Sequence, residues 1–362
     1  MLFRSGSATY NSNAKVVGLG VLQNGDSVIR QTKYCYTYQP GKSLLIMATF
    51  CMTSPQTGLR QRVGYFDGDN GVFLETDGTT ISFVIRKDVT GSISDAERSA
   101  QGTWNGDRLN SATPTATCPS GILLDLSKPQ IFWMDIEWLG VGSVRCGFII
   151  NGQIITCHTF HHANIMTLTG PYMATANLPI RYEITATGSV AATMNQICST
   201  IISEGGYEPQ TRIYTASMGI TTKGPVTSGT YYPLISIRLN SSYHDAIIRL
   251  HQLQGMITTA SSSPKNIHYK ILKNATLTGA SWTQHSSLHV DYDLSATVVS
   301  GGSILYEGYF NASKEIDFTD GTNPSYQIGR TIAGVSDVFT LVATGDTNNL
   351  DVAMEMGWYD FS

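Results

Sequence analysis

The stretch IFWMDIEWLGVGSVRCGFIINGQIITCHTFHH, residues 131–162, decides the fold class. From 132 to 138 the even positions are all apolar, whereas the odd positions include Asp135 and Glu137. Because successive side chains of a strand point to opposite faces, this alternation predicts a strand with one buried face. A three-residue turn at 140–142 would place Glu137 opposite Arg145. We therefore predict that Glu137 and Arg145 form a structural pair.

A second hairpin follows at Asn151-Gly152, because both central residues of a tight type I′ turn need positive φ. The third strand runs over 153–162, so residues 131–162 are predicted to form a three-stranded meander. A two-residue loop places His158 opposite Arg145 and Cys157 opposite Cys146. The two cysteines either pack as thiols on the buried face or form a disulfide, and the sequence leaves both options open.

The composition extends this β-rich pattern to the whole chain. Only 14% of the 362 residues are charged, against roughly a quarter in typical soluble domains, which excludes a coiled coil and a charge-rich disordered chain. Short β-branched and aromatic runs, separated by turn residues, predict an all-β protein of two antiparallel β-sandwich (jelly-roll or concanavalin-like) domains. A break in the pattern at 203–211 sets the domains at 1–205 and 206–362. The only helical candidate is a short surface insertion at 94–101.

Charge and cysteine content exclude several partners and cofactors. A net charge of -4, with Lys and Arg scattered singly, predicts no binding to nucleic acid or to an anionic membrane. Residues 1–15 lack the apolar core of a secretory signal, and the most apolar stretch, 43–52, is too short to span a bilayer. The six cysteines show no zinc-type spacing, which favours reduced thiols in the core.

Asp135 and Glu137 are candidate catalytic carboxylates. Two positions apart on one strand face, they lie about 7 Å from each other, a separation compatible with glycosidase chemistry. The strand resembles the Glu-x-Asp-x-Glu strand of laminarinase-like glycoside hydrolases. That pattern requires Glu where this chain has Trp133, so the nucleophile is missing. We therefore predict no catalytic residue and a protein that is not an enzyme.

Two further segments suggest metal ligands. In Cys157–His162, His158 and His162 share one strand face while His161 points to the other, which favours a polar sheet face over a metal site. The segment Asp67–Gly71 has calcium-loop residue types without the twelve-residue spacing, so a hairpin turn is the simpler interpretation. No nucleotide or nucleophile signature is present. We predict neither a metal nor another cofactor.

Three tyrosines, Tyr34, Tyr36 and Tyr38, fall on one face if their segment is a strand. Such a stripe is suited to stacking on sugars or to packing against another subunit. The alternative is a wall of the sandwich core with hydroxyl groups at its rim. We list the three residues as a candidate interaction surface.

Several segments carry a family resemblance: TKY (32–34), YQPG (38–41), VGYFD (63–67), TWNGDRL (103–109), SGILLDLSK (120–128), WLGVGSVR (138–145), PLISIRL (233–239) and TGASW (278–282). Together they resemble virion-associated structural proteins of tailed, particularly marine, phages and of large DNA viruses. The resemblance implies a virion location and a structural role as a capsid decoration (cement) protein or a head or tail fibre. It implies capsid or tail proteins as partners.

The main hypothesis is therefore a non-enzymatic virion structural protein. It would form homo-oligomers, a trimer being one option, because symmetric assembly buries exposed apolar patches. The alternative is a lectin-like carbohydrate-binding module on a host-recognition fibre, with a glycan as ligand.

Overall fold

The computed structural model describes residues 2–167, 169–206, 211–220, 226, 228–243, 245–258, 265–311, 318–319 and 324–362. In these ranges the chain consists of β-strands, loops and two short 3-10 turns, η1 (Gln101–Thr103) and η2 (Pro324–Tyr326). No helix among the described residues has the length and apolarity needed to cross a bilayer. The chain divides into unit 1, Met1–Tyr207, and unit 2, Glu208–Ser362. The predicted all-β class of jelly-roll or concanavalin-like sandwiches is confirmed.

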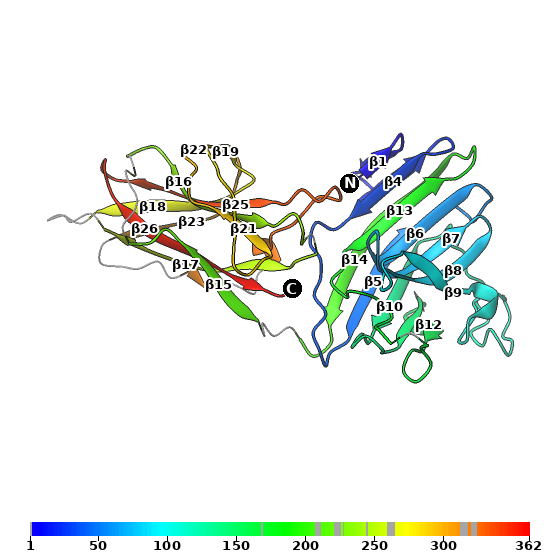
Figure 1. Cartoon of the computed structure of the whole chain (residues 1–362). Helices are drawn as coiled ribbons and strands as arrows, with labels where there is room; N and C mark the ends of the chain where they lie inside the picture. The colour runs from blue at the N-terminus through cyan, green and yellow to red at the C-terminus, as the bar shows by residue number, and fades with distance from the viewer. Residues whose placement is uncertain are drawn as a thin grey trace. The chain divides into compact units, whose positions relative to one another are not determined.

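Unit 1 contains two antiparallel sheets of seven strands each (Figure 1). Sheet A has the order β1 (Leu2–Arg4), β4 (Ser27–Gln31), β13 (Ile180–Ala186), β6 (Leu59–Phe66), β7 (Gly71–Asp77), β8 (Thr80–Lys87) and β9 (Ser94–Ala100). Sheet B has the order β12 (Gln153–Phe160), β11 (Val144–Ile150), β10 (Gln130–Ile136), β5 (Leu44–Cys51), β14 (Ala192–Ser203), β3 (Val16–Val21) and β2 (Ser7–Asn11).

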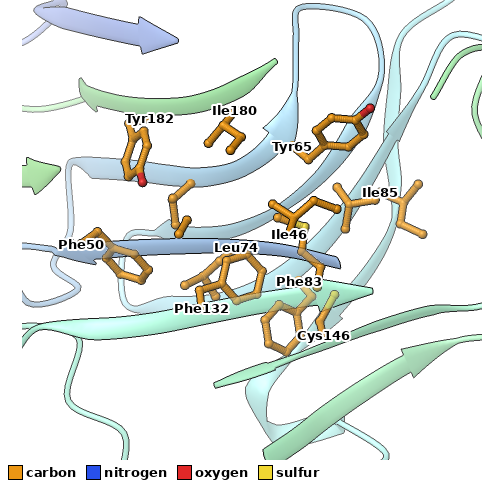
Figure 2. Packing of buried hydrophobic residues seen from close by; sticks show 14 of the residues in the cluster. Ile46, Phe50, Tyr65, Leu74, Phe83, Ile85, Phe132, Cys146, Ile180 and Tyr182 are labelled. Atoms are coloured by element: carbon orange, nitrogen blue, oxygen red, sulfur yellow. The ribbon is translucent and has the colours of Figure 1, made fainter. Parts of the chain in front are cut away.

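The core of unit 1 is formed by the apolar face of each sheet. In β5, LLIMATFC, every second residue is buried, as strand geometry requires when one face meets the core. Phe83 of sheet A stacks on Phe132 of sheet B with ring centroids 5.7 Å apart, and on Trp104 at 4.4 Å. Figure 2 shows Phe83 and Phe132 beside Cys146 in this packed layer. The sandwich is therefore joined by aromatic contacts between its sheets.

Unit 2 has a separate core between two main sheets. Sheet C has the order β15 (Arg212–Ser217), β26 (Val352–Asp360), β17 (Ile248–Ile257) and β24 (Phe318–Thr319). Sheet D has the order β20 (Thr283–Gln284), β21 (Val290–Asp293), β16 (Tyr232–Leu239), β25 (Val338–Gly345), β18 (Asn266–Lys273) and β23 (Ser303–Asn311). A small ribbon pairs β19 (Thr276–Thr278) with β22 (Val298–Ser300).

The predicted meander is present as β10, β11 and β12, but its first register is shifted by two residues. Arg145 lies opposite Asp135 and forms an ion pair with it, so the predicted pair with Glu137 is wrong. The turn is longer than three residues, because Leu139 and Gly140 both take positive φ (37° and 74°). The backbone amide of Glu137 donates to the Ser143 carbonyl instead (3.1 Å). A shift of two keeps every side chain on its predicted face, so the buried set is unchanged.

The second hairpin starts as predicted and then changes register at a bulge. Ile150 lies opposite Gln153, but beyond Gly147 the bulge places His158, and not Cys157, opposite Cys146. The predicted ladder of Glu137, Arg145 and His158 is therefore not formed. All six cysteines lie in the described ranges, and none of them forms a disulfide there. Burial raises the pKa of the Cys146 thiol well above its ordinary value.

The helical prediction at 94–101 is wrong, because Ser94–Ala100 forms the edge strand β9 and only the 3-10 turn η1 follows. Its charged residues Asp95, Glu97 and Arg98 form ion pairs with residues of β7 and β8. The turn prediction at Asp67–Gly71 is confirmed: it joins β6 to β7, and the Asp67 carboxylate accepts hydrogen bonds from the backbone amides of Asp69 and Asn70.

Double-mutant cycles test the observed register. Asp135→Asn and Arg145→Gln should be coupled by about 1 kcal/mol, because either substitution alone removes the ion pair between the two residues. Glu137→Gln and Arg145→Gln should be additive within about 0.3 kcal/mol. The free energies come from urea unfolding of the full chain. A larger coupling for Glu137 than for Asp135 would contradict the register.

Candidate functional site

The most unusual surface of unit 1 is the face of sheet A that points away from the core. There, β6, β7, β8, β9 and β13 carry charged side chains at alternating positions where an exposed sheet would carry small polar ones. Arg62 is nevertheless only 5% exposed and Glu75 only 1%. We call the connected set the arginine network; its members are Arg60, Arg62, Arg86, Arg98, Arg181, Glu75, Asp95 and Glu183.

An aromatic layer lies beneath these charges. Phe66, Phe73 and Val84 form a small buried cluster separate from the main core. The guanidinium groups of Arg62 and Arg86 lie over the Phe73 ring at 5.2 and 5.4 Å. A ring face attracts a cation, so this layer supports the arginines from below.

Gly64 of β6 lies opposite Phe73 of β7. A Cβ at Gly64 would come within 2.3 Å of the Val72 carbonyl oxygen and 2.7 Å of the Phe73 Cβ. The glycine therefore gives Phe73 the room that the aromatic layer needs.

Two glutamates of the arginine network bridge neighbouring strands. Glu75 of β7 accepts from Arg62 Nε (2.7 Å) and from Arg98 Nη2 (2.8 Å), which uses both carboxylate oxygens. Arg62 also lies 3.6 Å from Glu183 of β13, whose other oxygen accepts from Arg181 at 3.0 Å. Because every oxygen of both glutamates has a guanidinium partner, the two glutamates fix the positions of the arginines around them.

Asp95 connects the edge strand to the arginine network. It accepts two hydrogen bonds of 2.8 Å from Arg86, the bidentate geometry that the planar guanidinium favours. Burial raises the pKa of Asp95, but the hydrogen bonds and the charge of Arg86 outweigh this effect and hold that pKa below its ordinary value. The same pairing raises the pKa of Arg86. The pair is therefore ionised at neutral pH.

The arginine network leaves donors without acceptors. The Nε groups of Arg60 and Arg181 are buried and have no hydrogen-bond partner among the described residues. Five guanidinium groups face three carboxylates in this connected set, which leaves two positive charges unmatched. An anion at the exposed side chains of Arg60 and Arg98 would offset this charge.

The predicted histidine cluster is divided between different environments. His158 accepts from the Asn105 backbone amide at Nδ1 (3.3 Å), and burial lowers its pKa to about 4. His162 lies between the Gly142 carbonyl (2.5 Å) and the Glu97 carboxylate (2.7 Å). Glu97 also binds Lys87 at 2.9 Å. No group of three or more metal-ligating side chains occurs among the residues that the structure describes.

The three tyrosines do not form a stripe on a strand. Their segment is irregular apart from one bridge between Tyr36 and Leu178. Tyr38 is 8% exposed and packs edge to face against Trp138 at 5.6 Å, so it is part of the core. Tyr34 and Tyr36 are half-buried. Their contact with a partner stays a prediction.

The carboxylates considered from the sequence lie elsewhere. Asp135 is buried on sheet B beside Arg145, whereas the arginine network lies on sheet A. The missed residues did leave a signal, since the otherwise apolar strands contain Arg60-Gln-Arg62 and Arg181-Tyr-Glu183. That alternation places the charges on one face of each strand, but only the strand order brings β6, β7 and β13 together.

No protein-family model matches the chain, and no curated protein is similar to it. Solved structures that match include a glycoside hydrolase family 16 endo-glucanase from Bacteroides ovatus (10% identity, 54% of this chain and 85% of that chain, TM-score 0.34). The Crh5 transglycosylase matches at 13% identity over 57% and 79% of the two chains, with a TM-score of 0.33. A legume lectin-like domain from Entamoeba histolytica matches at 11% identity over 55% and 88%, with a TM-score of 0.31.

These matches contradict the prediction that the chain is not an enzyme, because a hydrolase and a transglycosylase are among the proteins found. Identities this low show the fold alone. They assign neither an activity nor a ligand to this chain.

The Asp95 pair predicts a pH-dependent stability. Because the pKa of Asp95 is lower in the folded chain than its ordinary 3.8, its stabilising contribution is present above pH 3.8 and is lost as the pH falls through the folded value. Asp95→Asn should therefore lower the free energy of unfolding at pH 7 and have little effect near pH 2, measured by urea unfolding. In a chain that already carries Arg86→Gln, Asp95→Asn should lower the free energy of unfolding at pH 7 by less than it does in the wild type. A cost that is equal at both pH values would contradict the prediction.

Proposed function

We propose that unit 1 is a carbohydrate-binding β-sandwich that holds an acidic glycan on the outer face of sheet A. The observation that carries the proposal is the arginine network, in which five guanidinium groups face three carboxylates. Sugar carboxylates and sulfates present planar or clustered oxygen acceptors, which guanidinium groups bind in a bidentate manner. This function corresponds to the lectin-like alternative of the sequence analysis.

A ligand can reach this face at two partly exposed residues of the arginine network, Arg60 and Arg98. The side chains of Arg60 and Arg98 are 31% and 40% exposed, while Arg62 between them is buried. Arg60 contacts Glu183 only at 3.6 Å, so its guanidinium can turn toward a ligand at little cost. The buried residues of the arginine network then hold the guanidinium groups in place, and Arg60 and Arg98 contact the glycan.

Binding to matched polysaccharides tests the proposal. At 0.15 M salt the full chain should bind polygalacturonate or dextran sulfate and should not bind dextran, which has the sulfated polymer's backbone without its charge. Arg60→Gln and Arg98→Gln should each weaken binding about tenfold, because each removes a charge-assisted hydrogen bond. Isothermal titration calorimetry measures the affinities.

Two control variants separate this site from general charge attraction. Lys128→Gln and Arg212→Gln each remove one positive charge outside the arginine network, and each should change the affinity less than about twofold. Equal losses in the controls, or no binding to either acidic polymer, would contradict the proposal.

The virion role implied by the sequence resemblance is a separate prediction. Mass spectrometry of purified particles tests it, since a structural component must be present in them.

A further inference from the structure

A second candidate binding surface lies in unit 2, on the outer face of sheet D. His268 of β18 and Tyr309 of β23 lie opposite each other, and their rings stack with centroids 4.4 Å apart and planes 13° apart. Tyr309 is nevertheless 73% exposed. Strand β23 is the last in the described order of sheet D, so the ring face that does not contact His268 is turned toward the sheet edge.

Two neighbouring tyrosines differ from Tyr309, because their rings are packed against the core of unit 2. Tyr269 is buried and Tyr306 packs against the core of unit 2, both on the opposite face of the same two strands. A tyrosine needed only for the core would be covered in the same way. Tyr309 instead presents an aromatic face to solvent.

A chain of hydrogen bonds orients the imidazole of His268. Lys270 can only donate, and its contact with the Tyr231 hydroxyl raises the pKa of Lys270. The Tyr231 hydroxyl and Nδ1 of His268 share a hydrogen bond of 2.7 Å. Burial lowers the pKa of His268, so its ring is neutral at pH 7.

The Nε2 atom of His268 is buried and has no hydrogen-bond partner in the part of the chain that the structure describes. The Glu307 carboxylate lies 3.5 Å from this atom and also 3.5 Å from Lys270 Nζ. Its side chain is 53% exposed, so it can accept from a ligand. The site thus combines an open ring face on Tyr309 and an exposed acceptor on Glu307.

We propose that Tyr231, His268, Lys270, Glu307 and Tyr309, the tyrosine-histidine patch, bind a pyranose ring of a neutral glycan. The apolar C–H face of the sugar would pack on Tyr309, since the ring face is electron-rich and apolar. A sugar hydroxyl would donate to the exposed Glu307 carboxylate. Lys270 and Glu307 offset each other's charge, which favours a neutral sugar over an acidic one. The patch is independent of the arginine network in unit 1.

Calorimetric titration of the full chain with five neutral hexasaccharides, from cellulose, xylan, mannan, laminarin and chitin, tests the patch. At least one should bind. Tyr309→Ala should weaken that binding at least tenfold, whereas Tyr309→Phe, which keeps the ring, should stay within about twofold of the wild type. Glu307→Gln should weaken it about threefold, because a charged acceptor is replaced by a neutral one.

Tyr10→Ala is the matched control, because it removes a 59% exposed tyrosine from β2 of unit 1; its affinity should equal that of the wild type. Binding of polygalacturonate should be unchanged in Tyr309→Ala, so failure of this patch is distinguishable from failure of the unit 1 site. No binding of any hexasaccharide, or equal binding by Tyr309→Ala, would overturn the proposal.

Discussion

The guanidinium of Arg62 is the contact on which the charged face of sheet A depends. It reaches Glu75 on β7, Asp95 on β9 and Glu183 on β13, so one side chain of β6 connects three other strands. Burying an arginine is unfavourable unless its partners are placed well. The strand order of sheet A, the glycine at position 64 and the Phe73 ring all serve this placement. A chain with few charged residues has concentrated eight of them on one surface.

Strand alternation made much of unit 1 predictable. The buried faces of β10 and β11 follow directly from the period-two pattern, and the Asn151-Gly152 turn follows from the positive φ that it needs. The pairing of Arg145 was not predictable in this way, because Leu139 adopts a positive φ that its side chain disfavours. The resulting loop shifts the register by two residues, so that Asp135 and not Glu137 lies opposite Arg145.

The candidate site was harder to predict, for a topological reason. Arg62, Glu75 and Glu183 come from strands that are separated by up to 121 positions in the sequence, yet β13 lies beside β6. The charge pattern of each strand indicates which of its faces is the outer one, but it does not indicate which strand lies beside it in the sheet. In β9 the cluster of charges even suggested a helix, whereas its side chains are spaced to meet β7 and β8. The order of the strands in sheet A brings these charges, which are far apart in the sequence, together on one surface.

The position of β9 at the edge of sheet A has one more consequence. An edge strand exposes unpaired backbone amides and carbonyls that can recruit a strand from another molecule. Asp95, Glu97 and Arg98 place charges along this edge, and a second strand could dock there only by desolvating them. Asp95 and Arg98, two members of the arginine network, therefore also disfavour edge-to-edge pairing of sheet A with another strand.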